Sequence, residues 1–199
     1  MNEETKQSKK ILRQHLKKVI NSLDQKEIAD RSQIVCDLLV KTQEFKQSDI
    51  VMIFLPLLRE VDVTLIALRS WQEGKIVCVP LVSWEHKHMI PVQIQSLDDP
   101  MKQDQFGLKQ PTNGLPVPIE DVDMVVVPGL GFDRVGRRIG RGGGFYDRFL
   151  SQPKFRGITC GVGFIDQVVD EVPVSASDVW LDMLATDTET LKFQHSNHK

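Results

Sequence analysis

Short apolar runs rich in β-branched residues are the feature that most constrains the fold. They occupy residues 50–56, 75–80, 123–128 and 157–164. Continuous runs of this length are typical of strands buried on both faces, as in a parallel sheet. A fifth run, residues 89–94, contains Pro91, and proline cannot donate a hydrogen bond within a ladder. We therefore expect this run at an edge of the sheet.

Segments with helical periodicity separate these runs. Leucine and valine recur at spacings of four, three and four between residues 12 and 23, which predicts a basic amphipathic helix at the N-terminus. A capping-box pattern at residues 22–25 predicts a second helix that ends near residue 41. Alternating helices and strands favour a single α/β domain, residues 1–190, with a mostly parallel sheet flanked by helices on both faces. Residues 191–199 are polar, and we expect a disordered tail.

Two connecting segments carry weaker signals. Asp62 is placed to cap a short helix that ends near Leu68. Residues 98–118 are polar and contain four prolines, so we expect a long surface loop, and loops of this length are often functional.

Charge and cysteine usage exclude several classes of protein. A formal net charge of −2 argues against a chain that coats nucleic acid or an anionic membrane. The three cysteines lie scattered in apolar runs, which favours buried thiols in a reducing compartment over disulfides. The N-terminus lacks the apolar segment of a secretory signal, and no apolar run approaches the roughly 20 residues that span a bilayer. We therefore expect a cytoplasmic monomer that binds small molecules, and neither nucleic acid nor membrane.

Glycine and arginine concentrate directly after the run that ends at Pro128. Seven of the chain's 13 glycines lie between residues 129 and 144, interleaved with arginines at 134, 137, 138 and 141. Glycine lets a ligand approach the backbone, consecutive amides hold an anion, and arginine binds phosphate oxygens bidentately. Open α/β sheets bind ligands beyond the carboxyl ends of their strands. The segment therefore predicts a phosphate site, followed by a short helix that begins near Gly144 and adds free N–H groups.

Other interpretations of this segment stay open. Its spacing fits neither a Walker A loop nor a GxGxxG dinucleotide motif. It could be a disordered Arg/Gly segment that binds RNA, which the net charge disfavours, or a glycine-rich turn with solvated arginines. A sugar-phosphate isomerase or acyl-transfer enzyme would need an acid–base pair here, and the five histidines lie elsewhere. Asp147, three residues past the last glycine, either holds one of the arginines or binds Mg²⁺.

The sequence GRGGGFYDRFL, residues 140–150, after PGLGFD, residues 128–133, resembles the signature of the 5-formyltetrahydrofolate cyclo-ligase family. Weaker similarities follow in the expected order: KKILR at residues 9–13, FLPLLREVD at 54–62, the strand that ends at Pro80, and Val172-Pro173 followed by Asp178. The resemblance implies that ATP, as co-substrate, and Mg²⁺ convert 5-formyltetrahydrofolate to 5,10-methenyltetrahydrofolate, with release of ADP and phosphate. The γ-phosphate would activate the formyl oxygen, and N10 would then attack the formyl carbon.

The resemblance also implies the site residues. Those expected to bind ATP are Lys9, Lys10, Arg13, Arg138, Ile139, Gly140, Arg141, Gly142, Gly143, Gly144, Phe145 and Tyr146. Those expected to bind the folate are Leu55, Glu60, Phe106, Arg141, Gly142, Gly143, Gly144 and Phe145. Lys9 and Arg141 are implied to be catalytic, and Asp147 and Asp178 to bind Mg²⁺.

Two positions depart from the pattern of the family. Phe145 stands where the family usually has the first of two tyrosines, so ring packing is kept while a phenolic hydrogen bond is lost. One glycine of the GRGGG run stands where some members carry lysine, which removes a possible phosphate contact.

Overall fold

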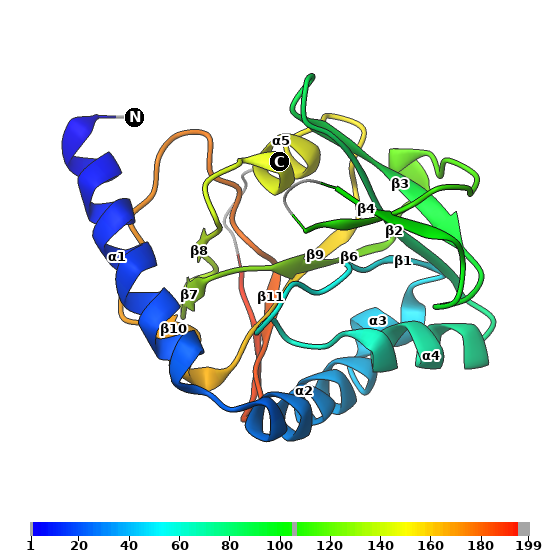
Figure 1. Ribbon diagram of the computed structural model, residues 1–199, viewed down its shortest axis with the longest axis horizontal. Coiled ribbons are helices and arrows are strands. Elements are labelled where there is room, and N and C mark those ends of the chain that lie inside the picture. The colour runs from blue at the N-terminus through cyan, green and yellow to red at the C-terminus, as the bar shows by residue number, and fades with distance from the viewer. Residues whose placement is uncertain (1, 105–106, 195–199) are drawn as a thin grey trace.

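The computed structural model describes residues 2–104 and 107–194. At its centre lies a seven-stranded sheet with the strand order β12-β11-β9-β6-β1-β2-β3 (Figure 1). The strands are β1 Ile50–Met52, β2 Ile76–Ser83, β3 His88–Ile94, β6 Met124–Pro128, β9 Ile158–Val162, β11 Met183–Ala185 and β12 Thr190–Lys192. The five inner strands pair in parallel, whereas β3 and β12 pair antiparallel at the two edges. The expected mostly parallel sheet is confirmed, and so is the edge position of the strand that contains Pro91.

The boundaries of several elements differ from the sequence prediction. The run 50–56 forms a ladder only as far as Met52; Ile53 still donates to the Cys78 carbonyl at 2.9 Å, and the chain then leaves the sheet. The segment 98–118 is not one open loop, because β4 Met101–Gln103 pairs with β5 Lys109–Pro111.

The predicted disordered tail begins too early. Leu191 and Lys192 pair with β11 instead, because Leu191 and Phe193 pack against the core. Residues 195–199, the rest of the predicted tail, lie outside the described residues.

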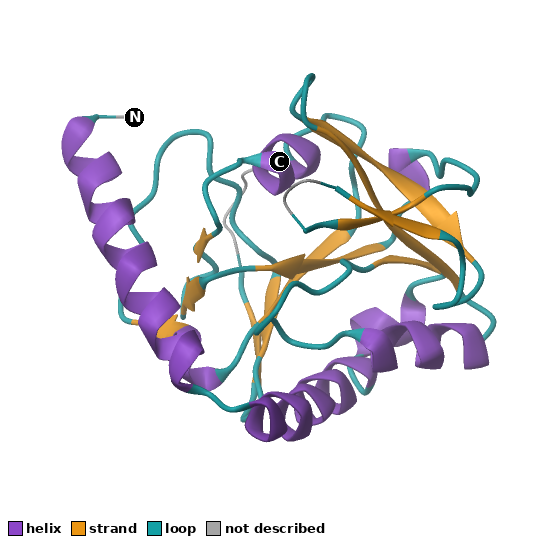
Figure 2. Cartoon of the chain, viewed as in Figure 1, coloured by secondary structure: helices purple, strands orange, loops and turns teal. Residues whose placement is uncertain are grey.

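Helices cover both faces of the sheet, as predicted (Figure 2). On one face lie α2 Gln25–Val40, α3 Gln43–Gln47 and α4 Thr64–Gln72, and on the other lies α5 Phe145–Leu150. The N-cap of α2 is Asp24, which forms a capping box with Glu27, so the predicted box at 22–25 was placed two residues too early. Asp62 accepts a hydrogen bond from the first backbone N–H of α4, at 3.0 Å, as its sequence position suggested.

The N-terminal helix, α1 Glu3–Ser22, does not lie flat on the large sheet. It packs across a second sheet of three short strands, ordered β10-β7-β8, which extends beyond the end of β6 (Figure 1). These strands are β7 Gly131–Asp133, β8 Arg138–Ile139 and β10 Val168–Val169. Leu16 and Ile20 of α1 contact Leu130, Ile139 and Val172. Short 3₁₀ helices, Ile119–Asp121 and Ile165–Gln167, precede β6 and β10. Within residues 2–104 and 107–194, no helix is long and apolar enough to cross a bilayer.

Candidate active site

The glycine-arginine segment is ordered between its flanking strands and α5. It forms β7, a tight turn, β8, the loop of residues 140–144, and then α5. Two of the interpretations left open by the sequence are therefore wrong. The segment is not disordered, and its arginines are not all solvated, since Arg138 is only 8% exposed.

Unpaired backbone amides line the loop of residues 140–144. None of these five N–H groups donates a hydrogen bond to an acceptor in the described part of the chain. The φ angles of Gly142 and Gly144 are +104° and +66°, values that L side chains rarely adopt, and they let the loop curl tightly. Successive free amides in such a turn form a concave anion site. Helix α5 has only six residues, so the loop amides rather than a long helix dipole would hold an anion.

Replacing Gly142 tests this loop directly. A Cβ at this position would approach no atom closer than 3.7 Å, so the strain of Gly142→Ala comes from φ alone. The expected result is an unfolding free energy lowered by about 1–2 kcal/mol and a raised KM for ATP, because the amides must move. Gly74→Ala is the matched control, since Gly74 also has a positive φ, +74°, with open space around it and no place in the site. Equal kinetics for the two variants would contradict an anion-binding role.

Arg138 and Asp147 form a mostly buried ion pair beneath the loop. The Arg138 Nη2 lies 3.0 Å from the Asp147 Oδ1, and its Nη1 donates to the Pro128 carbonyl at 3.2 Å. The guanidinium also lies 5.7 Å from the centroid of the Tyr146 ring. The sequence left two roles open for Asp147, and the structure shows that it holds an arginine. Its Oδ2 accepts no hydrogen bond from the described residues, so one oxygen stays available to a metal.

Lys9 and Asp178 form a second ion pair, which ties α1 to the segment before β11. The Lys9 Nζ donates to Asp178 Oδ2, and also to Ser175 Oγ at 3.3 Å; Lys9 is only 5% exposed. Burial raises the pKa of Asp178, but hydrogen bonds from Lys9 and Ser175 and the lysine charge outweigh it, so the net pKa lies below its usual range. Asp178 is therefore ionised at neutral pH.

The two residues expected to bind Mg²⁺ are linked through the backbone next to one of them. The backbone N–H of Val179, the neighbour of Asp178, donates to Asp147 Oδ1 at 3.3 Å. Within residues 2–104 and 107–194, no cluster of three His, Cys, Asp or Glu side chains could hold a metal by itself. Two carboxylates suit Mg²⁺ that is bound mainly through substrate phosphates and water.

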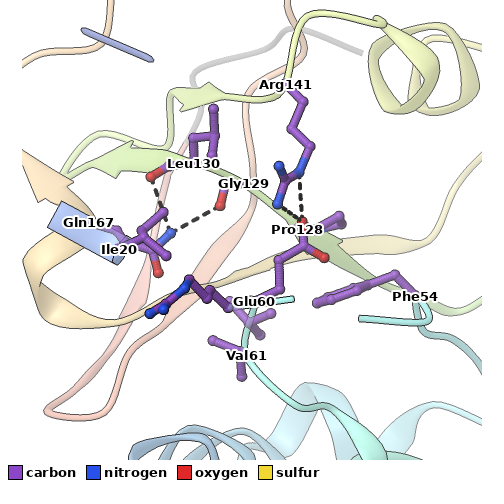
Figure 3. A pocket seen from close by; sticks show the side chains of 11 residues that line it. Ile20, Phe54, Glu60, Val61, Pro128, Gly129, Leu130, Arg141 and Gln167 are labelled. Carbon is purple, nitrogen blue, oxygen red and sulfur yellow. Dashed lines mark hydrogen bonds and ion pairs between the residues drawn. The ribbon is translucent and has the colours of Figure 1, made fainter. Parts of the chain in front are cut away.

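Arg141 and Glu60 face each other across a narrow pocket at the carboxyl ends of β6 and β9 (Figure 3). The Arg141 Nε and Nη2 both lie 2.9 Å from Glu60 Oε1, and Glu60 Oε2 accepts from the Leu57 N–H at 2.9 Å. Arg59 precedes Glu60 with a φ of +68°, which is strained for a residue with a side chain. The remaining pocket holds about 10 Å³, room for about one water. The ion pair therefore narrows the pocket.

The other predicted site residues differ in their burial and in their contacts with the loop. Arg13 donates from Nε to the Gly140 carbonyl at 2.9 Å, so the basic helix does reach the loop. Lys10 is exposed, and Leu55 packs at the edge of the core. The Ile139 side chain is 1% exposed and faces α1, so only its backbone could meet a ligand. Phe106 lies outside the described residues.

Burial raises the pKa of Tyr146, and the nearby Glu60 charge raises it further, so the phenol stays neutral. This side chain lies with Arg138 at the base of the loop.

Sequence reasoning missed the residues that hold Phe145. Its ring meets Trp84 edge to face, with centroids 5.0 Å apart, and the Arg148 guanidinium lies 5.2 Å from its centroid. Arg148 also donates to the Lys87 carbonyl at 2.6 Å and to the Gly143 carbonyl at 2.7 Å. These contacts fix the ring that replaces the usual tyrosine. An exposed tryptophan at the tip of the β2–β3 hairpin was the only sequence signal that could have suggested them.

Gln167 was missed as well. It is buried beside the pocket and donates to the carbonyls of Gly129 and Leu130 at 3.0 and 3.1 Å, which ties the start of the glycine-arginine segment to the 3₁₀ helix before β10 (Figure 3). A lone glutamine carries no sequence signal for such a role.

The sequence and the fold of this chain are similar to those of known proteins. Residues 5–187 match the 5-formyltetrahydrofolate cyclo-ligase family. The chain belongs to this family. The structure of Aquifex aeolicus 5,10-methenyltetrahydrofolate synthetase superposes with a TM-score of 0.82 and 30% identity, over 96% of this chain and 95% of that one. The mouse 5-formyltetrahydrofolate cyclo-ligase is 26% identical over 88% of this chain and 91% of its own length. A mitochondrial cyclo-ligase of Arabidopsis thaliana is 38% identical over 34% of this chain, and the match spans only 28% of that relative's length.

Membership of the cyclo-ligase family removes the alternatives from other classes. An RNA-binding protein, a sugar-phosphate isomerase and an acyl-transfer enzyme were each compatible with parts of the sequence, but the match covers nearly the whole chain, from residue 5 to residue 187. The roles of the individual site residues stay predictions, and replacing the members of the ion pairs described above would test them.

Proposed function

We propose that this chain catalyses the ATP- and Mg²⁺-dependent cyclisation of 5-formyltetrahydrofolate to 5,10-methenyltetrahydrofolate, with ADP and phosphate as the other products. One observation carries the proposal beyond family membership. Five unpaired loop amides lie on the same segment as Arg138 and Arg141, and Arg13 and Lys9 approach from α1. These groups supply the backbone donors and the positive charge that binding of a triphosphate requires.

The chemistry follows from the poor reactivity of an N-formyl group. Its oxygen attacks the γ-phosphorus, the bond to the β-phosphate oxygen breaks, and ADP leaves. N10 then attacks the activated formyl carbon and loses its proton to solvent, and the carbon–oxygen bond breaks as phosphate departs. In such transfers a protein mainly positions the reactants and offsets charge. We assign this role to Lys9 and Arg141, and their ion pairs support it, because a substrate phosphate could replace the carboxylate partner of each.

Asp147 and Asp178 are the residues that would hold Mg²⁺. Each uses one oxygen in an ion pair, and neither Asp147 Oδ2 nor Asp178 Oδ1 accepts a hydrogen bond within the described part of the chain. When bound, Mg²⁺ would neutralise phosphate charge and orient the γ-phosphate.

Glu60 is proposed to bind the folate. Its carboxylate accepts from Arg141 and from the Leu57 N–H, so it stands at the mouth of the pocket and would accept hydrogen bonds from N–H groups of the pterin ring. Opening the Arg141–Glu60 pair would free Glu60 for the folate and Arg141 for phosphate.

The experiment that tests the function uses the purified full-length chain. We expect absorbance of the methenyl product to rise only when 5-formyltetrahydrofolate, ATP and Mg²⁺ are all present, with one ADP formed per product. Omission of Mg²⁺ with excess chelator should stop the reaction. Absence of turnover with all three components would refute the proposal.

We also propose that the chain acts as a cytoplasmic monomer. The three cysteines are free and buried, which suits a reducing compartment. Size-exclusion chromatography with light scattering would test the monomer, since a stable dimer would elute at twice the mass of 22.6 kDa.

A further inference from the structure

Two segments of the candidate site follow strands of the small three-stranded sheet. Strand β7 ends at Asp133, a turn follows, and β8 leads into the loop of residues 140–144. Strand β10 pairs in parallel with β7, with Val169 opposite Asp133, and leads into the segment that carries Asp178. The position of Asp178 relative to the loop therefore depends on what joins this turn to the segment after β10.

Asp133 joins the two segments through its buried carboxylate. The residue is 0% exposed. Its Oδ1 accepts from the backbone N–H groups of Val135 and Arg137, at 3.1 and 2.9 Å, which closes the turn. Its Oδ2 accepts from the N–H of Val172 at 3.1 Å, six residues before Asp178. One side chain thus fixes the turn that precedes β8 and the start of the segment that ends at Asp178.

Arg137 also joins the turn before β8 to the segment after β10, and its contact with Trp180 lies on the C-terminal side of Asp178. Its guanidinium carbon lies 5.1 Å from the centroid of the Trp180 ring, and its Nη1 lies 2.8 Å from Glu171 Oε1. Its Nε is buried without a hydrogen bond, 3.8 Å from Asp133 Oδ2. The Glu171 carboxylate is exposed, so that ion pair adds little, and the contacts with Trp180 and Asp133 carry the argument.

We propose that Asp133 and Arg137 are positioning residues for MgATP, a role that rests on the proposed function. Neither lines the pocket or the loop. They act through the segment 171–181, which they hold at Val172 on one side of Asp178 and at Trp180 on the other. That segment sets the distance from Asp178 and Val179 to Asp147 on the loop side. Of the residues expected to bind the folate, Leu55 and Glu60 follow β1, which none of these contacts reaches, whereas residues 141–145 belong to the loop and the start of α5.

The test compares Asp133→Asn, Arg137→Met and the matched control Asp123→Asn in the full chain. Asp123 Oδ2 likewise accepts two backbone N–H groups, from Asp49 and Ile50 at 2.8 Å, but at the amino ends of β1 and β6, away from the site. Dissociation constants for MgATP and for 5-formyltetrahydrofolate are measured by calorimetry, at a temperature where thermal melts show each variant folded. Steady-state KM values for both substrates are measured beside them.

Asp133→Asn and Arg137→Met are expected to weaken MgATP binding by about 10-fold or more, as replacements behind a metal site do, and to weaken folate binding less, because Leu55 and Glu60 lie outside these contacts. Asp123→Asn should change neither constant. A folded Asp133→Asn or Arg137→Met variant with normal MgATP affinity would overturn the proposal, and so would equal losses for both substrates. If Asp133→Asn does not fold, the MgATP and folate dissociation constants of Arg137→Met decide the outcome. Lack of turnover by the wild-type chain refutes the cyclisation instead, because the binding constants do not require turnover.

Discussion

Asp147→Ala is expected to lower kcat by about 10³-fold or more. The carboxylate has one oxygen on Arg138 and one without a partner in the described part of the chain, beside the segment that carries Asp178. Its loss would remove a Mg²⁺ ligand and also release a buried arginine. A metal stabilises transition-state charge by several kcal/mol, and about 4 kcal/mol corresponds to about 10³-fold in rate. The measurement is initial rate against Mg²⁺ concentration for the wild-type chain and the variant.

A double-mutant cycle separates the two roles of Asp147. If the carboxylate only holds Arg138, Asp147→Ala should cost nothing further in an Arg138→Met background. If it binds Mg²⁺, the double variant should be slower than Arg138→Met alone and should need more Mg²⁺ for half-maximal rate. Near-normal turnover of Asp147→Ala at low Mg²⁺ would exclude the metal role outright.

The second large effect is expected at Arg141. Arg141→Ala should lower kcat/KM by about 10²–10³-fold, the size of loss seen when one charged or donor group that stabilises a transition state is removed. The Arg141 side chain pairs with Glu60. Because 46% of this side chain is exposed, it has room to turn toward a phosphate. A loss mainly in kcat would indicate contact with the transferred phosphate, whereas a loss only in KM would indicate binding of the ground state.

Arg134→Ala is the matched control for Arg141. Arg134 belongs to the same glycine-arginine segment, but its Nη2 pairs with Glu189 at 2.7 Å and its side chain is 59% exposed. The pair is a surface ion pair, so its removal should leave both the stability and the kinetics nearly unchanged. Equal effects at Arg134 and Arg141 would mean that the overall charge of the segment matters, rather than the position of one arginine.

The sequence located the strands better than their ends. Apolar runs such as residues 123–128 identified five strands of the large sheet, because burial on both faces leaves a continuous pattern of β-branched residues. The strands β7, β8 and β10 were not predicted, since strands of two or three residues are too short to show a periodicity. Leu191 was assigned to a tail because its neighbours are polar, yet one apolar side chain beside the core was enough to extend the sheet.

Within the candidate site, the sequence by itself located the loop that we expect to bind an anion. Clustered glycines and arginines after a buried strand are local features, and the resemblance of residues 140–150 to the cyclo-ligase family added Lys9, Glu60 and Asp178 from distant positions. Only the tertiary structure decided the partners: Lys9 meets Asp178 across 169 positions of sequence, and Arg141 meets Glu60 across 81. Local spacing carries no information on such pairs, because they depend on how α1, the loop after β1 and the small sheet pack together. The same packing makes Asp133, a residue that the sequence offered only as part of a motif, the link between the two halves of the site.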